Sequence, residues 1–539
     1  MKRVGIILMA MVLSAGSVTS FGAEKLEPVA EINFVTWTSA KYMSYYETSN
    51  QIAEEWTKLG LKVNLNSTNF PNPMVSLWFR EHKFDCILSV LSGLPERMEP
   101  DFFTNAQFNS AHTDPGNWNV GEWKNPEFDK IGLKQLELYD SQKRRELIYK
   151  LQEIIYSEQP DAVILYPIDN YAINTTRVDL DYVPSTEGIR AIWNYARFTP
   201  KGADKVLKMG RVADQTTWNP LAAVQSDDFF QLRLVYDRLV QVDNEGGVKM
   251  WVAESVKNVN ETTIEVTLKK GLKFHDGRPL TGSDVKFSYE YMKKWEAPYF
   301  TKYLEPIKEI ELVDPYKMRF HLKRPYAPFI MNTLGQVFIL PEHVWKDIPE
   351  KQGLKKPQEY RNVPLVGSGM FKLDYWKEGQ EFLMVRNGDH FMAPKADILT
   401  VIFGSSELVM SALKKGTLDL SYQIVPPIVA REFETEKNLR VFKGKSCGYM
   451  SVRFHAGKAP FNDRALRVAL SHAIPHERII KEIYMGDAGM SASTVVPVNA
   501  FWHNKNLKFR EFNLEKAKSV LKEAGFRWDD QGRLCYPPK

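Results

Sequence analysis

The alternation of apolar and polar positions is clearest in the middle of the chain. Within 263–268, apolar side chains at every second position predict a strand with one buried face. Residues 274–277, Phe-His-Asp-Gly, predict a tight turn, because aspartate accepts backbone hydrogen bonds and glycine tolerates a left-handed conformation. A helix is expected from Val285, with Ser283 at the position of its cap.

The amino-terminal part predicts strands and helices in alternation. Residues 31–37 and 61–66 are expected to be strands on either side of an amphipathic helix at 45–59. Residues 84–88 predict a short buried strand, and 141–157 predict a second amphipathic helix. Strands and helices that alternate through short turns indicate a parallel or mixed α/β sheet.

The first residues are typical of a secretory signal peptide. Lys2 and Arg3 precede a short apolar run, and small residues follow up to Gly22. The run is too short for a membrane span, so we expect residues 1–22 to be removed and the mature protein to be periplasmic. No cysteine stands near this cleavage site, so no lipid anchor is expected.

Composition narrows the classes of partner and fold. The net charge of +5 is modest for this length and comes without a basic block, so nucleic acid is not an expected partner. Three scattered cysteines cannot form a disulfide framework. The length of 539 residues is sufficient for two or three domains with their own cores.

The stretch 252–284 closely resembles the signature of the family 5 (peptide, oligopeptide and nickel-type) extracellular solute-binding proteins of bacterial ABC transporters. Residues 205–527 resemble the family's amino-terminal portion in order, including the motifs at 218–221 and 366–369. The segment before residue 168 resembles its carboxy-terminal portion, so the two portions are exchanged. A circular permutation is the simplest interpretation. A fusion of fragments from two paralogues and a gene-model error are the alternatives.

The resemblance implies an α/β fold of the type II periplasmic-binding-protein class, with two lobes of mixed sheets and a hinge between them. Lobe I is expected at 168–448, with an extra subdomain at about 252–345. Lobe II is expected to combine 24–167 with 449–539. The chain should pass between the lobes near 165–168 and again near 449–453.

The resemblance also implies ligand contacts. The loop after the strand at 84–88 lies where α/β sheets place ligands. In peptide-binding relatives, an acidic residue of this loop receives the α-amino group of the peptide, and Glu96 matches that position. Gly93 replaces the tryptophan of these relatives and Glu96 replaces an aspartate, so a solvated loop acid remains an alternative. The other expected ligand contacts are Gln225, Ser226, Tyr422, Gln423 and Tyr449.

The expected function is binding rather than catalysis. The chain contains no GxSxG, no phosphate-binding glycine loop and no dinucleotide-binding glycine pattern, and we expect no cofactor or metal. The resemblance implies a monomeric receptor that encloses a peptide-like ligand and delivers it to a membrane permease and its ATPase. An oligosaccharide, an opine or a metal chelate is the alternative ligand. An exported hydrolase and a signalling or chaperone-like holder are the alternative classes.

Overall fold

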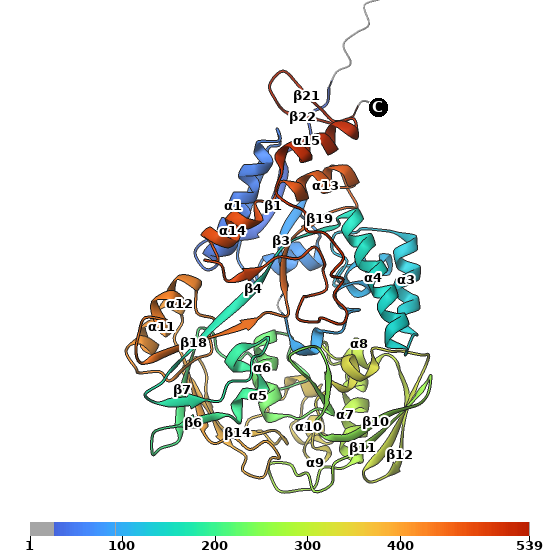
Figure 1. Cartoon of the computed structure of the whole chain (residues 1–539). Helices are drawn as coiled ribbons and strands as arrows, with labels where there is room; N and C mark the ends of the chain where they lie inside the picture. Colours follow the sequence, from blue (N-terminus) through green and yellow to red (C-terminus); the bar gives the residue numbers. More distant parts are fainter. Residues whose placement is uncertain (1–25, 92, 538–539) are drawn as a thin grey trace, which may run out of the picture.

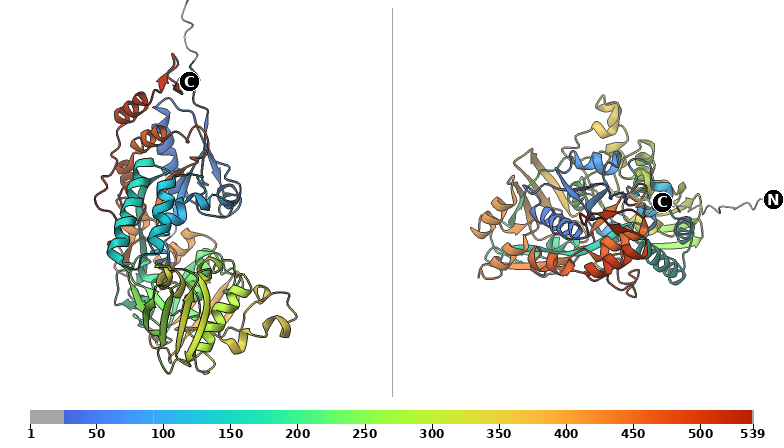
Figure 2. Two further views of the ribbon diagram at one scale, coloured as in Figure 1. Left: turned by 90° about the vertical axis from the view of Figure 1, so that its right-hand side faces the viewer. Right: turned by 90° about the horizontal axis from the view of Figure 1, so that it is seen from above.

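The computed structural model describes residues 26–91 and 93–537, which form two lobes stacked end to end (Figures 1 and 2). The signal-peptide prediction for residues 1–22 lies outside this range. One sheet of twelve strands runs through both lobes in the order β14-β15-β16-β7-β17-β4-β19-β3-β1-β2, with β18 and β20 also paired to β4. Among the described residues, no helix is both long enough and apolar enough to cross a membrane.

The upper lobe of Figure 1, called lobe II here, comprises residues 26–167 and 449–537. In it β1 (Ile32–Trp37) pairs in parallel with β2 (Val63–Thr68) and with β3 (Cys86–Leu91). β3 pairs antiparallel with β19 (Tyr449–Phe454). Strands from the two ends of the chain therefore belong to one sheet, as predicted. Its helices are α1 (Met43–Thr57), α2 (Asn105–Phe108), α3 (Pro126–Leu136), α4 (Ser141–Glu158), α13 (Arg464–His472), α14 (His476–Glu482) and α15 (Leu514–Glu523).

Both ends of the chain also share the core of lobe II. The Trp56 ring stacks on Phe34, with centroids 5.5 Å apart, and on Phe454 at 6.0 Å. Its indole nitrogen donates to the Leu470 carbonyl at 3.2 Å. The buried faces of α13 and α15 complete this cluster. Residues before 168 thus depend on residues after 448 for burial of their apolar side chains.

The first and last described residues meet at one edge of lobe II (Figure 1). Pro28 forms a β-bridge with Cys535 of the terminal hairpin, β21 (Arg527–Trp528) and β22 (Leu534–Cys535). The Tyr536 amide donates to the Glu27 carbonyl at 2.9 Å. Lys539, expected near the mature amino terminus, lies outside the described residues.

Lobe I comprises residues 168–448 and carries two larger sheets. It also carries two short antiparallel pairs, β5 (Val178–Leu180) with β6 (Phe198–Pro200) and β8 (Val240–Val242) with β9 (Val248–Met250). Its part of the large sheet contains β7 (Val206–Arg211), β14 (Phe371–Lys377), β15 (Glu381–Arg386), β16 (Asp397–Ile402), β17 (Leu420–Ser421) and β18 (Leu439–Lys445). A separate antiparallel sheet, β10-β11-β13-β12, lies in the segment expected to form an extra subdomain. Its strands are β10 (Ala253–Asn260), β11 (Thr263–Leu268), β12 (Ile307–Asp314) and β13 (Lys317–Leu322). The helices of lobe I are α5 (Ile192–Tyr195), α6 (Ser226–Val235), α7 (Gly282–Lys294), α8 (Thr301–Leu304), α9 (Glu342–Trp345), α10 (Ile348–Lys351), α11 (Ser406–Lys414) and α12 (Pro427–Phe433).

The motif around residue 275 has a structural role. Gly277 adopts a positive φ of 86°, and the half-buried His275 imidazole bridges the backbone of Gly367 and Gly369. The helix cap is Thr281 rather than Ser283, because the Thr281 hydroxyl and backbone form the capping box with Asp284. The Ser283 hydroxyl instead donates to Glu342 at 2.8 Å.

The strand β4 (Asp161–Asn174) connects the lobes. Its first half pairs with β19 of lobe II, and the last paired residues are Leu165 and Met450. Its second half pairs with β18 of lobe I, beginning with Ile168 and Lys445. The first chain passage therefore falls at 165–168, where it was expected. The second lies at 446–448, just before the expected 449–453, because all of β19 pairs within lobe II.

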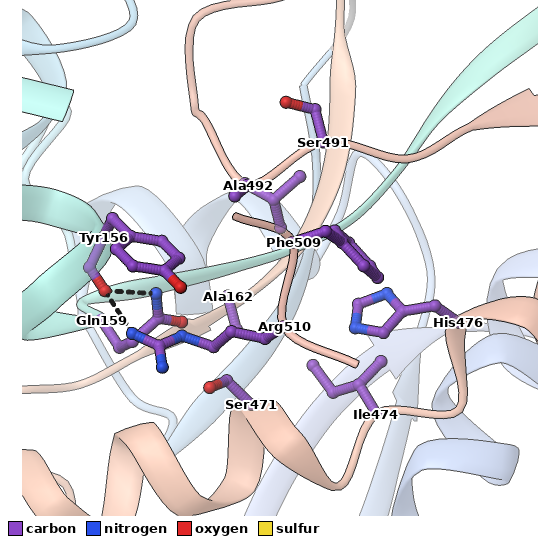
Figure 3. A pocket seen from close by; sticks show the side chains of 11 residues that line it. Tyr156, Gln159, Ala162, Ser471, Ile474, His476, Ser491, Ala492, Phe509 and Arg510 are labelled. Carbon is purple, nitrogen blue, oxygen red and sulfur yellow. Dashed lines mark hydrogen bonds between the residues drawn. The ribbon is translucent and has the colours of Figure 1, made fainter. Parts of the chain in front are cut away.

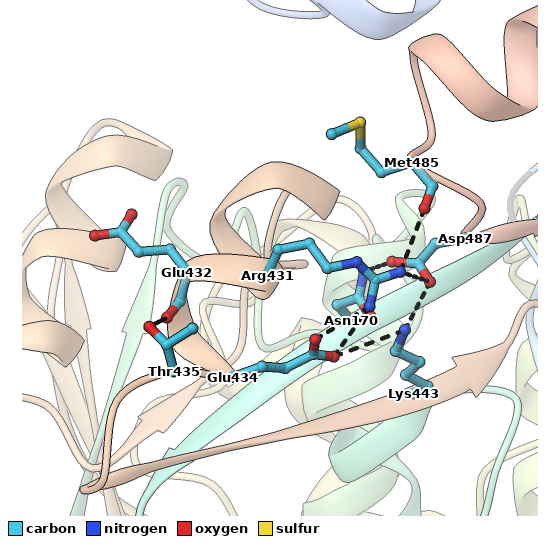
Figure 4. A network of polar contacts seen from close by, with 8 residues as sticks. All are labelled: Asn170, Arg431, Glu432, Glu434, Thr435, Lys443, Met485 and Asp487. Carbon is cyan, nitrogen blue, oxygen red and sulfur yellow. Dashed lines mark hydrogen bonds and ion pairs between the residues drawn. The ribbon is translucent and has the colours of Figure 1, made fainter.

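The outer side of this hinge carries a polar network (Figure 4). The Asp487 carboxylate accepts from Lys443 at 2.7 Å, from Arg431 at 3.2 Å and from Asn170 at 3.0 Å. Asp487 directly precedes β20 (Ala488–Gly489), which pairs with β4 at 166–167. Since Arg431 and Lys443 belong to lobe I, this carboxylate of lobe II joins the two lobes behind the hinge.

Candidate ligand-binding site

The carboxyl ends of strands from both lobes point toward the region between the lobes. β4 runs from lobe II into lobe I, and β3 runs in the same direction because both are antiparallel to β19. β1 is parallel to β3, so Trp37 and the loop after residue 91 face lobe I. β17 is antiparallel to β4 and parallel to β7, so Arg211 and Tyr422 face lobe II. Open α/β sheets bind ligands at such ends.

Lobe II contributes aromatic side chains to this region. The Trp37 ring contacts Tyr42, Tyr45 and Phe70, with centroid distances of 4.9, 5.3 and 4.9 Å. Tyr42 and Tyr45 stack on one another at 5.8 Å. Phe70 remains 37% exposed. These four rings, the aromatic wall, offer a surface for apolar or stacking groups of a ligand.

Lobe I contributes charged side chains grouped around Tyr422. The Tyr422 ring lies between two guanidinium groups, at 5.0 Å from that of Arg190 and 4.7 Å from that of Arg211. Its hydroxyl donates to the Asp227 carboxylate at 3.4 Å. Asp227 follows Gln225 and Ser226, which open helix α6. This group, the charged wall, stands opposite the aromatic wall.

The two walls stand at strand ends of opposite lobes that point toward each other, and the electrostatic effects between them agree with this arrangement. Burial raises the pKa of Tyr42, and the Asp227 carboxylate of the opposite lobe adds to the rise. Burial likewise raises the pKa of Tyr45, with a further contribution from Asp169 of β4. Burial also raises the pKa of Asp169 to about 6, although the Arg190 guanidinium opposes this rise. Asp169 therefore lies at the base of the region, next to the hinge.

Glu96 is buried between the lobes, with 3% of its surface exposed. Its carboxylate forms ion pairs with Arg238 and, at 3.7 Å, with Arg233, both from lobe I. Although burial opposes ionisation, Arg238 and Arg233 hold the pKa of Glu96 below its ordinary value. The Gln336 side chain donates to the Glu96 carbonyl at 2.7 Å. In this conformation the carboxylate expected to receive a ligand ammonium is paired with arginine.

The remaining expected contacts divide into two groups. Gln225, Ser226 and Gln423 are exposed or half-buried beside Asp227 and Tyr422. Tyr449 instead lies in the interior of lobe II, 1% exposed, and its hydroxyl donates to Asp161 at 3.2 Å. All six residues of β19 are buried, so their side chains pack on both faces of the sheet.

Arg190, Arg211 and Asp169 were not anticipated from the sequence. Arg190 ends a single 3-10 turn (Gly188–Arg190), Arg211 ends β7, and Asp169 lies within β4. None belongs to a recognisable local pattern. Only the lobe I fold brings the two arginines next to Tyr422.

A cavity inside lobe II is a poor ligand site (Figure 3). It is lined by residues that include Tyr156, His476 and Arg510, and its volume is about 20 Å³. That is room for about one water molecule. This cavity is therefore too small to enclose a ligand.

Comparisons with known proteins agree with this architecture. The model of the bacterial extracellular solute-binding proteins, family 5 Middle, matches residues 247–537. The oligopeptide-binding protein AppA of Bacillus subtilis is 30% identical over 336 residues, which are 61% of this chain and 60% of the relative. The dipeptide-binding protein of Escherichia coli is 29% identical over 285 residues, 49% of this chain and 52% of the relative. The chain thus spans at most about 60% of the length of these curated relatives.

A solved structure shows the same fold. NikZ from Campylobacter jejuni, in complex with Ni(L-His), superposes with a TM-score of 0.52 at 22% identity, covering 62% of this chain and 66% of that chain. The predicted type II periplasmic-binding-protein fold is confirmed.

Proposed function

Because the chain belongs to the bacterial extracellular solute-binding proteins of family 5, we propose that it is the receptor of an ABC importer. It encloses a small peptide-like ligand between its two lobes and presents it to a membrane permease and its ATPase. Members of this family are extracellular or periplasmic binding proteins rather than enzymes. We further propose that the protein is exported, acts as a monomer and requires no cofactor.

The observation that carries this proposal is the hinge. Among the described residues, the chain passes between the two halves of the large sheet only in β4 and at 446–448, and the two walls face each other beside this junction. A rotation at 165–168 would change the distance between the walls while leaving each lobe intact. A ligand that contacts both walls binds the closed form more tightly and so stabilises it.

The charged wall supports a peptide-like ligand. Gln225, Ser226, Tyr422 and Gln423 offer hydrogen-bonding groups on the lobe I side, and we propose them as ligand contacts. We assign Glu96 to closure of the lobes rather than to the ligand, because its partners are arginines of lobe I. Tyr449 supports the fold of lobe II.

The aromatic wall favours a second candidate ligand, an oligosaccharide. Four adjacent rings, Trp37, Tyr42, Tyr45 and Phe70, offer flat apolar faces of the kind on which sugar rings stack. A neutral sugar would use these rings together with the uncharged hydrogen-bonding side chains of lobe I. It would leave the charges of the opposite wall without a partner.

We also propose that the family's two portions are exchanged by circular permutation. The family model matches residues 247–537, whereas lobe II needs residues 26–167 as well to complete its sheet and core. Pro28 contacts Cys535, so residues 26–167 could follow residue 537 directly without disturbing lobe II. This contact supports the proposal that the two segments of lobe II derive from one continuous segment.

Calorimetric titration with pooled di- to pentapeptides and with neutral oligosaccharides tests the receptor function. Small-angle scattering is recorded before and after each addition. We expect heat and a smaller radius of gyration with one ligand class. Neither heat nor compaction with any class would reject the receptor function. Turnover of a peptide or glycan panel would favour the exported hydrolase instead.

A further inference from the structure

Arg190 is a cation without an anionic partner. Within the described part of the chain, no carboxylate lies within ion-pair distance of its guanidinium group, and its Nε has no hydrogen-bond acceptor. The three other arginines nearby are engaged. Arg233 pairs with Glu187 at 2.7 Å, Arg238 pairs with Glu96, and Arg211 donates to Gln215 at 3.2 Å.

Aromatic rings hold this guanidinium in place. Its centre lies 4.6 Å from the centroid of Phe230 and 5.0 Å from those of Tyr171 and Tyr422. Ring faces attract a cation and restrict its motion without neutralising its charge. The side chain is half-buried, and Tyr422 beside it follows the strand end that faces lobe II. Arg190 is therefore preorganised for a partner that the protein itself does not supply.

The neighbouring acids do not take that place. Glu187 is paired with Arg233, and Asp227 accepts from Tyr422 while lying 3.9 Å from Arg211. Asp169 projects from the same face of β4 as Tyr171, since the two are two residues apart in a strand. The Asp169 carboxylate nevertheless makes no hydrogen bond or ion pair with the described residues. The position beside Arg190 is left for a group from outside.

We propose that Arg190 binds a carboxylate of the ligand, with Tyr171, Phe230 and Tyr422 orienting its guanidinium. This rests on the proposed function, in which a peptide-like ligand occupies the region between the lobes. A planar guanidinium with several donors matches a carboxylate in geometry as well as in charge. The carboxylate is either the carboxyl terminus of a peptide or an acidic side chain, and the two sources can be separated experimentally.

The first experiment uses only the unmodified protein. Calorimetric titration measures the affinity of a peptide ligand and of the same peptide with an amidated carboxyl terminus. It also measures the affinity of acidic peptides and of forms in which aspartate or glutamate is replaced by asparagine or glutamine. Neutralising the carboxylate that reaches Arg190 should weaken binding about thirtyfold or more, as for a charge pair in a desolvated site that loses one partner. Neutralising the other carboxylates should have little effect.

The second experiment assigns the discrimination to Arg190. In Arg190→Gln, the charged and neutralised peptides should bind with equal affinity. Arg361→Gln is the matched control, because Arg361 pairs with Glu378 on an exposed surface of the same lobe, and it should retain the discrimination. If neutralising each ligand carboxylate in turn left the affinity of the unmodified protein unchanged, this inference would be overturned. The receptor function would remain. Failure of all peptides to bind would reject this inference together with the peptide-like ligand, and failure of the oligosaccharides as well would reject the receptor function.

Discussion

The Glu96 carboxylate of lobe II forms a buried ion pair with Arg238 of lobe I. Arg233, also from lobe I, lies 3.7 Å from the same carboxylate oxygen. Moving the lobes apart would separate these charges and expose them to water. The contact therefore favours the conformation in which the two walls face each other, and it acts before any ligand is present.

Glu96→Gln tests this role. Loss of one partner leaves Arg238 buried without an opposite charge, so the free energy of unfolding should fall by about 3–5 kcal/mol, unless the lobes open and hydrate the arginine. Urea denaturation measures the first outcome, and an increased radius of gyration of the unliganded protein shows the second. If Glu96 instead bound a ligand ammonium group, acetylation of the peptide's amino terminus would weaken binding as much as the substitution. The unliganded protein would then be unchanged.

Local patterns in the sequence predicted the individual elements well. The strand expected at 263–268 is β11, and the strands expected at 31–37 and 84–88 are β1 and β3 within a few residues. These segments have one buried face or are buried throughout, so their apolar spacing reflects their position directly. The sequence did not predict β4 as one long strand, because its second half carries polar residues at the hinge, among them Asp169 and Asn170.

The charged wall could not be predicted in the same way. Arg190 and Tyr422 are far apart in the chain and come together only when β4, β17 and α6 assemble. The arginine partners of Glu96 depend on the angle between the lobes, which no local pattern encodes. Tyr422 was proposed as a ligand contact only because a family resemblance indicated it, and a resemblance cannot indicate residues for which no motif is known.

Asp169→Asn should stabilise the protein. Burial raises the pKa of Asp169 from its ordinary value of 3.8 to about 6, so the folded state favours the protonated carboxyl. The stability that this group contributes is greatest below pH 4 and is lost as the pH rises toward and through 6. Removing the charge should raise the free energy of unfolding at pH 7 by about 1–3 kcal/mol.

Denaturant titrations between pH 4 and pH 7.5 measure this effect. The groups that face Asp169 are Arg190, Tyr45, Tyr171, Cys447 and Tyr484. Burial raises the pKa values of the tyrosines and of the thiol, so none of them titrates in this range. The control is Asp179→Asn, whose side chain is 65% exposed and should change little. If the free energy of unfolding depended on pH equally in the unmodified protein and in Asp169→Asn, the raised pKa would not belong to Asp169.

Asp487→Ala should weaken the junction behind the hinge (Figure 4). Asp487 is 3% exposed, and its loss leaves the Asn170 amide without this acceptor. A decrease of about 2 kcal/mol in the free energy of unfolding is expected, mostly from the buried hydrogen bond, since Arg431 and Lys443 are partly hydrated. Asp347→Ala removes an exposed pair and serves as the control. Similar losses in the two variants would show that the network contributes little.

The permutation predicts that the order of the segments can be reversed. A chain that begins at residue 204, continues to 537, passes through a linker of about four glycine and serine residues, and ends with 26–203 should fold. The new ends would lie in the exposed turn between β6 (Phe198–Pro200) and β7, where no strand is interrupted. The linker would span the site where the Tyr536 amide already bonds to Glu27 at 2.9 Å.

This reordered chain should match the original in unfolding midpoint and in ligand affinity, because every strand of lobe II keeps its neighbours. The control uses the same linker but opens the chain between Ile168 and Asp169, inside β4. That break separates the halves of the one strand that pairs in both lobes, so this variant should lose cooperative unfolding. Loss of folding in the chain opened at 204 would instead mean that the two segments of lobe II do not derive from one continuous unit.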